Sequence, residues 1–148
     1  MNLIIYLSGE IHSSWRDEIQ HGINAENLPI DILAPITDHA ASDDVGTDIL
    51  GDEAKPFWKD HKSAKINAMR IRAAIDRADI VVVKFGEKYK QWNAAFDAGY
   101  AAAKGKSLIT LHAPDIQHAL KEIDAAAMAT AETPGQVVEI LKYVALKV

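Results

Sequence analysis

Short apolar runs alternate along the chain with segments in which apolar residues recur every three or four positions. Four runs rich in β-branched residues cover residues 3–7, 30–34, 79–85 and 107–112. Runs of this length, bounded by Ser, Gly or Pro, are typical of strands buried on both faces. A weaker run over residues 127–131 predicts a short fifth strand.

The segments between the runs show the 3.6-residue spacing of amphipathic helices. We expect Ser13 or Ser14 to cap a first helix, in which Trp15, Ile19 and Ile23 share one face. Further helices are predicted over residues 63–77 with Ile66, Met69, Ala73 and Ala74 as the apolar stripe, over residues 91–104 with Gly105 just past the end, and from a capping box at residues 133–136.

Residues 35–60 show neither period clearly, and so long a gap in a compact fold predicts a functional loop or lid. This segment contains Asp38, His39, Asp43 and Asp44. Carboxylates and imidazoles bind zinc or manganese, which leaves a metal-dependent hydrolase as one hypothesis. The spacing matches no recognised metal motif, however, so we predict no metal and no organic cofactor.

Strands that alternate with helices predict an α/β fold with a parallel sheet covered on both faces. For five strands we expect a three-layer, flavodoxin-like or Rossmann-like sheet in the order 2-1-3-4-5, forming a single domain over residues 1–148. Ligands of such sheets bind beyond the carboxyl ends of the strands, where the order reverses between strands one and three.

Composition narrows the possible partners. The chain has no cysteine, 49% hydrophobic residues and a net charge of −5, which argues against a general binder of nucleic acid. No segment has the ~20 consecutive apolar residues of a membrane span, and the first ten residues do not form a signal peptide, so we expect a cytoplasmic protein.

One carboxylate lies in the otherwise apolar helix predicted after the third strand. The residues three and four positions from Asp97 are all uncharged, so no ion pair within the helix accounts for it. Asp97 lies about two turns from the start of this helix, close to the expected ligand crevice. One interpretation is a solvated surface carboxylate, as for most aspartates; the other is a functional group directed into the crevice.

The loop after the first strand is unusually polar. Gly9 permits either close backbone approach to a ligand or a turn with positive φ, and Glu10, His12 and Arg16 follow within seven residues. The residues of this loop also fit an ordinary helix start, with a serine cap and Trp15 in the core.

At these residues the chain resembles the YtoQ group of nucleoside 2-deoxyribosyltransferase-like proteins. The resemblance rests on "YLSGEIHSSWR", "TDHAASD", "FWKDHKSAKINAMR" and "FGEKYKQWNAAFDAGYAAA", and it covers essentially the whole chain. It implies an enzyme that transfers or hydrolyses at an N-glycosidic bond of a nucleoside or nucleotide. It also implies a homo-oligomer. The "PFWKDH" segment either forms that contact or folds back on its own domain. From charge and hydropathy, we expect neither nucleic acid nor membrane as a partner.

The resemblance implies a role for several residues. Asp97 matches the glutamate that attacks the anomeric carbon in related enzymes, and Tyr6 would orient it. Substrate would contact Ser8 and Gly9 through the backbone, and His12 is a further substrate-binding candidate. Trp92 or Trp15 would stack on the base, and Asn93 would bond to the base or sugar.

The sequence also departs from the family pattern. Aspartate is one methylene shorter than glutamate, and the acid that usually manages the proton of the leaving base is missing from residues 91–94. We name Glu10 and Asp43 as substitutes. The missing acid also supports an alternative function, a nucleotide- or nucleobase-binding protein without catalytic activity, since a fold does not fix a function.

Overall fold

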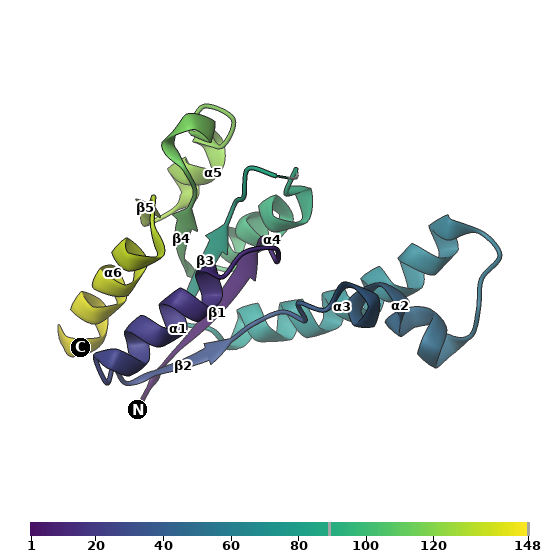
Figure 1. The fold of residues 1–148 in the computed structure, drawn as a ribbon, viewed down its shortest axis with the longest axis horizontal. Coiled ribbons are helices and arrows are strands. Elements are labelled where there is room, and N and C mark those ends of the chain that lie inside the picture. Colours follow the sequence, from purple (N-terminus) through teal and green to yellow (C-terminus); the bar gives the residue numbers. More distant parts are fainter. Residues whose placement is uncertain (89, 148) are drawn as a thin grey trace.

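The computed structural model describes residues 1–88 and 90–147, and its centre is a parallel sheet (Figure 1). Five strands pair in the order β2-β1-β3-β4-β5, which confirms the predicted order. The strands are β1 Leu3–Gly9, β2 Ile30–Leu33, β3 Ile80–Lys84, β4 Ser107–Leu111 and β5 Ala129–Ala131. Because β1 pairs with both β2 and β3, the winding of the chain reverses between β1 and β3.

Helices cover both faces of the sheet, as expected, with α1 and α6 on one face and α3, α4 and α5 on the other. The helices are α1 Trp15–Ala25, α2 His39–Leu50, α3 Pro56–Arg77, α4 Trp92–Ala103, α5 Lys121–Ala126 and α6 Pro134–Lys147. The sequence analysis predicted nothing between β4 and β5, where the short α5 and a 3-10 turn at Pro114–Ile116 lie. Ile116, Leu120, Ile123 and Ala127 of this segment recur every three or four residues and pack against the core. Among the described residues, no helix is both long and apolar enough to cross a bilayer.

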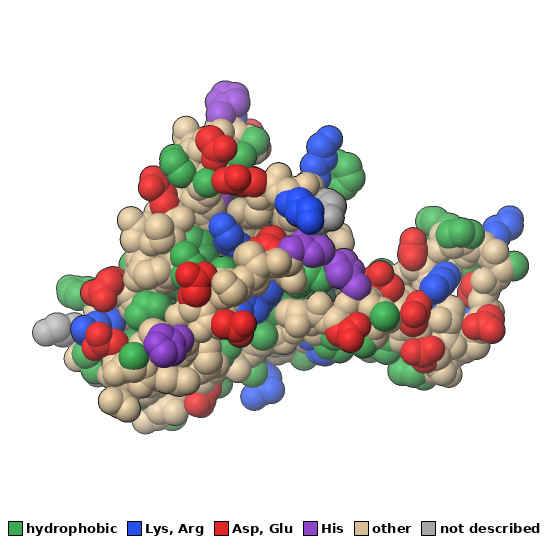
Figure 2. Space-filling model, viewed as in Figure 1, with side chains coloured by type: hydrophobic (Ala, Val, Ile, Leu, Met, Phe, Trp, Pro, Cys, Tyr) green, Lys and Arg blue, Asp and Glu red, His purple; other side chains and the backbone are tan. Residues whose placement is uncertain are grey.

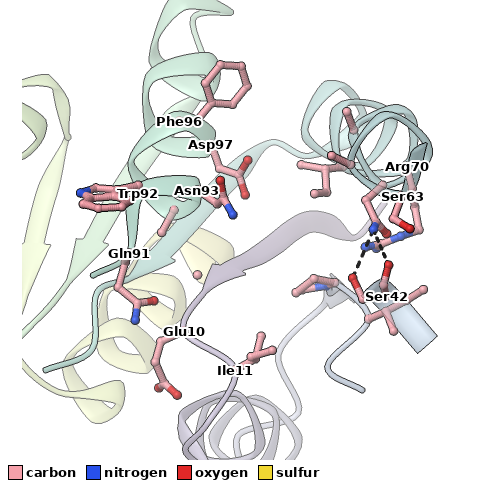
Figure 3. Close-up of a pocket in the computed structure, with 18 of the residues that line it drawn as sticks. Glu10, Ile11, Ser42, Ser63, Arg70, Gln91, Trp92, Asn93, Phe96 and Asp97 are labelled. Atoms are coloured by element: carbon pink, nitrogen blue, oxygen red, sulfur yellow. Dashed lines mark hydrogen bonds between the residues drawn. The ribbon is translucent and has the colours of Figure 1, made fainter. Parts of the chain in front are cut away.

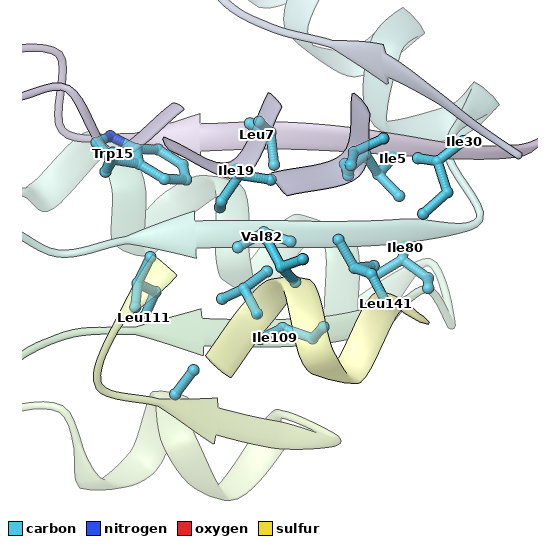
Figure 4. Close-up of a cluster of buried hydrophobic side chains, with 14 of the residues drawn as sticks. Ile5, Leu7, Trp15, Ile19, Ile30, Ile80, Val82, Ile109, Leu111 and Leu141 are labelled. Atoms are coloured by element: carbon cyan, nitrogen blue, oxygen red, sulfur yellow. The ribbon is translucent and has the colours of Figure 1, made fainter. Parts of the chain in front are cut away.

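The face covered by α1 and α6 is packed with large side chains (Figure 4). Trp15, Ile19 and Ile23 of α1 are buried, as their common face predicted, and Leu141 of α6 is fully buried beside them. Large aliphatic and aromatic groups contribute most of the hydrophobic stabilisation, about 1.5–3 kcal/mol for each side chain removed from water. This face is therefore a closed core.

On the opposite face, α4 packs through small side chains. Ala94, Ala98 and Ala101 of α4 are buried against the sheet, and Tyr6 of β1 is fully buried on the same side. A helix that packs through alanines approaches its sheet closely, so a polar group one position along it can lie near a strand. Asp97 occupies such a position, next to Ala98.

The predicted loop over residues 35–60 is wrong. Most of this segment is helical: α2 lies within it, and α3 begins at Pro56, seven residues before the predicted start. The two helices form a hairpin, and its end stands clear of the body of the molecule (Figure 1). We call the hairpin of α2 and α3 the arm.

Of the arm, α2 and the first seven residues of α3 escaped prediction, because the two helices pack there through small polar groups rather than through an apolar stripe. A side chain added at Gly46 would meet Ser63 N at 2.4 Å, so the two helices touch at this point. The backbone N–H of Gly46 donates to Ser63 Oγ over 3.0 Å, and Ser63 Oγ donates to Asp43 O. The predicted stripe of α3 is wrong too, since Met69 is 67% exposed while Ile75 is fully buried.

Two predicted helix ends are confirmed, and a third differs. Gly105, with φ of +71°, follows α4, and the N–H of Lys106 donates to Ala101 O, as in a Schellman ending. Thr133 Oγ1 accepts from the N–H of Gln136 at the start of α6. Ser14 stands at the N-cap position of α1, but its side chain makes no capping bond.

Candidate functional site

A crevice of about 1050 Å³ opens between α3 and α4, beyond the carboxyl ends of β1 and β3 (Figure 3). It lies where the reversal of strand order predicted a ligand site. Seven of the residues proposed from the sequence line it: Gly9, Glu10, His12, Asp43, Trp92, Asn93 and Asp97. The other three, Tyr6, Ser8 and Trp15, are buried and do not line it.

Asp97 extends from α4 toward the crevice (Figure 3), and its carboxylate is held by the sheet. Ser8, near the end of β1, donates its hydroxyl to Asp97 Oδ2 over 2.6 Å. Among the described residues, Oδ1 accepts no hydrogen bond, and no cation lies within ion-pairing distance of either oxygen. Of the two interpretations, the solvated surface carboxylate does not describe this residue.

Burial raises the pKa of Asp97 above its ordinary value, because desolvation disfavours the charged form. The hydrogen bond from Ser8 and the positive charge of Arg70 act in the opposite direction without cancelling the effect of burial. A carboxylate that is only weakly stabilised as an anion is more reactive toward an electrophilic carbon than a fully solvated one.

Tyr6 lies below Asp97, with its hydroxyl buried and without a hydrogen-bond partner of good geometry among the described residues. Burial and then the negative charge of Asp97 raise the pKa of Tyr6 to about 12, against the smaller effects of Arg70, Arg16 and Ser8. The phenol therefore stays neutral at ordinary pH and can donate a hydrogen bond near the carboxylate.

Glu10 is engaged by its own loop. Its carboxylate accepts from the backbone N–H of His12 and from Ser13 Oγ, and in Figure 3 it is directed away from Asp97. Burial raises the pKa of Glu10, but the hydrogen bonds from Ser13 and His12 outweigh it, and the pKa lies below its ordinary value. Such a group is an ionised acceptor and is poorly suited to donate a proton to a leaving base.

The loop after β1 is fixed by close backbone packing. Gly9 has φ of +109°, and a Cβ there would lie 2.2 Å from Lys84 O at the end of β3. Trp15 Nε1 and Arg16 Nη1 both donate to Glu10 O, over 2.8 and 2.6 Å. Only glycine fits this contact, as the sequence suggested for a close approach, although the neighbour is a strand of the protein itself.

The two tryptophans proposed to stack on a base differ in their surroundings. Trp15 is 2% exposed, because it lies on the buried face of α1 and packs in the closed core. It therefore cannot reach a ligand in the crevice. Trp92 is 74% exposed at the crevice rim, and its ring extends away from Asp97 (Figure 3). Asn93, by contrast, lies beside Asp97 within the crevice (Figure 3).

His12 and the start of the arm form another edge of the crevice. The rings of His12 and His39 stack with centroids 5.1 Å apart, and His39 Nδ1 lies 3.9 Å from Asp43 Oδ2. Within residues 1–88 and 90–147, no three His, Cys, Asp or Glu side chains gather as a metal site would require. The histidines and acids of the arm therefore provide an edge of the crevice rather than an assembled metal centre.

The sequence analysis did not assign the α3 wall of the crevice, although the resemblance had marked Asn67 and Arg70 as residues in a region where the family often carries an aspartate. This wall contributes Asn67, Arg70 and Ile71, while the sequence had placed the apolar stripe on a different side of this helix. The spacing of Ile71 and Ile75, one turn apart, is the signal that could have found the correct side. Arg70, the residue before Ile71, also lines the crevice.

The sequence matches a known protein family and a curated relative over most of its length. The sequence matches the family described as nucleoside 2-deoxyribosyltransferase YtoQ over residues 6–145. It is 44% identical, over 143 residues and 97% of each chain, to the uncharacterized protein YtoQ of Bacillus subtilis (strain 168).

Two solved structures share the fold at low sequence identity. A conserved protein from Enterococcus faecalis V583 aligns with a TM-score of 0.66 and 16% identity, covering 97% of this chain and 99% of the other. The DNA processing protein A of Helicobacter pylori, which binds single-stranded DNA, aligns with a TM-score of 0.55 and 15% identity, covering 97% and 81%. At these identities the likeness concerns the fold alone.

Proposed function

Because the chain belongs to the nucleoside 2-deoxyribosyltransferase YtoQ family, we propose that it cleaves or transfers the N-glycosidic bond of a nucleoside or nucleotide through Asp97. The observation that carries this proposal is the hydrogen bond of 2.6 Å from Ser8 Oγ to Asp97 Oδ2 at the mouth of the crevice. It fixes one oxygen of the carboxylate and leaves the other open to a substrate.

The proposed reaction has two steps. Oδ1 of Asp97 attacks the anomeric carbon of the sugar, and the bond from that carbon to the base nitrogen breaks as the ester bond forms. The electron pair of the broken bond goes to the base, which takes up a proton. Water or a second base then attacks the same carbon and releases the carboxylate.

The remaining candidates fit different roles. Asp43 lines the crevice and stays a candidate for the proton donor, whereas the carboxylate of Glu10 is bonded to its own loop. Asn93 would bond to the base or sugar beside Asp97, and His12 would contact the substrate from the opposite edge. Tyr6 and Ser8 would act through Asp97 rather than on the substrate.

The test is release of free base. A panel of deoxynucleosides, ribonucleosides and their monophosphates is incubated with the protein, and products are separated by chromatography with and without a second base as acceptor. We expect Asp97→Asn to lower base release by a factor of about 10³ or more, as for loss of a covalent nucleophile. Unchanged base release in this variant would exclude Asp97 as the nucleophile.

The matched control is Asp76→Asn. Asp76 is a surface carboxylate paired with Lys104 over 3.2 Å, outside the crevice lining. We expect the substitution Asp76→Asn to leave base release unchanged. Melting curves of both variants would show that any loss is not caused by unfolding.

The hydrogen bonds that Glu10 makes within its own loop support a second candidate function. Since Glu10 is committed to Ser13 and the His12 backbone, the crevice contains one carboxylate of raised pKa, Asp97, within the described residues. A nucleotide-binding protein without catalytic activity would need no proton donor. Ligand-induced rises in melting temperature without any base release, with or without an acceptor base, would favour this function.

We further propose that the protein is a homo-oligomer in contact through the arm. Ile49, Leu50, Phe57 and Trp58 are exposed there, and acidic side chains surround them (Figure 2). Exposed apolar groups gathered at one place indicate a contact surface. Light scattering after size-exclusion chromatography gives the mass directly, and a monomer at working concentrations would contradict the proposal.

A further inference from the structure

Arg70 lines the crevice, but its guanidinium has few hydrogen-bond partners within the protein. Its Nε is buried and has no hydrogen-bond partner among the described residues, and its Nη1 has only a long contact of 3.5 Å to Ala34 O. No described carboxylate lies within ion-pairing distance of its guanidinium. Buried donors without acceptors are costly, so a bound ligand that supplied acceptors would gain by meeting them.

The guanidinium lies close to the proposed reaction centre. Arg70 and Asp97 line the same crevice, and the positive charge of Arg70 lowers the pKa of Asp97 and that of Tyr6. Arg70 projects from α3 and Asp97 from α4, so the two side chains belong to opposite walls of one crevice (Figure 3). A ligand that spans the crevice would contact both.

The chemistry of Arg70 favours a phosphate monoester as the group it binds. A guanidinium offers parallel N–H donors that match two oxygens of a phosphate, and such charge-assisted bonds are roughly twice as strong as neutral ones. The crevice volume of about 1050 Å³ is large enough for a sugar, a base and a phosphate together. Arg70 would also stand between the phosphate and the carboxylate of Asp97 and reduce their repulsion.

We propose that Arg70 binds the phosphate of a sugar phosphate and makes the protein selective for nucleoside monophosphates over nucleosides. The inference rests on the proposed function only for the identity of the sugar-bearing substrate. The phosphate contact itself requires no bond to break. It can therefore be tested by binding alone.

The first experiment measures binding calorimetrically for two pairs of probes. These are 2-deoxyribose 5-phosphate against 2-deoxyribose, and deoxyadenosine monophosphate against deoxyadenosine. We expect the phosphorylated member of a pair to bind about 10- to 100-fold more tightly, the range for hydrogen bonds to charged groups. Equal affinity within both pairs overturns the proposal, and this comparison requires no variant.

The second experiment localises the effect. Arg70→Gln is expected to remove the preference for the phosphorylated probe, whereas Arg72→Gln is the matched control. Arg72 is two positions along α3, lines the same crevice and lies over the ring of Tyr100, 5.9 Å from its centroid. A full preference in Arg70→Gln, or an equal loss in both variants, overturns the assignment. Arg70→Lys keeps the charge without the paired donors and should fall between.

Two further results separate this inference from the proposed function. Asp97→Asn should keep or increase the preference for phosphate, since it removes a negative charge near the site. Base release from nucleosides and monophosphates at equal efficiency would leave the proposed function intact and overturn this inference. Inorganic phosphate that binds as tightly as the sugar phosphate would also overturn it, because the site would then recognise a free anion.

Discussion

On the two faces of the sheet, α1 and α4 pack through side chains of very different size. On one face, α1 and α6 fill the space with Trp15, Ile19 and Leu141. On the other, α4 contributes Ala94 and Ala98, and the space left between α3 and α4 is the crevice. Large side chains close one face and stabilise the fold, while small ones on the other allow a carboxylate to approach a strand.

The difference extends to polar groups. Residues of β1 alternate in direction, so Ile5 and Leu7 face the closed core while Tyr6 and Ser8 face the other side. Ser8 and Tyr6 are buried there beside Asp97, whose pKa is raised by burial. The closed core and the proposed nucleophile therefore lie on opposite faces of the same strand, and substitutions should separate stability from base release.

The largest effect on stability is expected in the closed core. Leu141→Ala removes a fully buried side chain and should lower the free energy of unfolding by about 3–5 kcal/mol, measured by denaturant titration. Base release per folded molecule should stay close to that of the parent protein. A variant that kept its stability, or lost its turnover while folded, would contradict the separation of the two faces.

The reverse pattern is expected for Ala98→Leu on α4. Ala98 is fully buried, so the larger side chain should cost about 1–3 kcal/mol and push α4 away from the sheet. Because Asp97 is the preceding residue, its distance from Ser8 should increase and base release should fall more than for Leu141→Ala. Equal turnover in the two variants would show that the position of α4 does not matter.

Removing the hydroxyl that holds the carboxylate tests the site itself. Ser8→Ala should lower base release by about 10- to 100-fold, because a hydrogen bond to a charged group contributes about 1.5–3 kcal/mol. Ser13→Ala is the control, since Ser13 donates to Glu10 instead. If Ser13→Ala is the more damaging of the two, Glu10 rather than Asp97 is the critical carboxylate.

The pH dependence of turnover should follow the raised pKa of Asp97. Protonation removes the nucleophile, so base release should fall as the pH drops through a pKa above the ordinary value of an aspartate. The hydrogen bond from Ser8 lowers that pKa, so Ser8→Ala should move the acidic limb to higher pH. If the acidic limb of Ser8→Ala stays at the pH of the parent protein or moves to lower pH, Asp97 is excluded as the titrating group.

The smallest effect on stability is expected for Tyr6→Phe. The hydroxyl is buried without a partner of good geometry among the described residues, so its removal should change the free energy of unfolding by about 1 kcal/mol or less. A melting curve measures this. A loss of several kcal/mol would mean that the hydroxyl makes a contact on which the second face depends.

Sequence reasoning succeeded where local pattern and burial agree. The apolar runs predicted the strands, and Gly105 and Thr133 marked helix ends because glycine and threonine satisfy particular backbone geometries. It failed for the arm, where Gly46 and Ser63 join two helices without an apolar stripe. It also proposed Trp15 as a base-stacking residue, although its spacing with Ile19 already favoured the core.

The sequence by itself determined the alternation of strands and helices, the sheet order that follows from it, and the presence of a lone acid after the third strand. Only the tertiary structure decided that Ser8 holds this acid, that Glu10 is bound by its own loop, and that Arg70 faces the crevice. Periodicity is a property of neighbouring residues, whereas these contacts join side chains from separate elements. Their geometry depends on how the helices pack on the sheet.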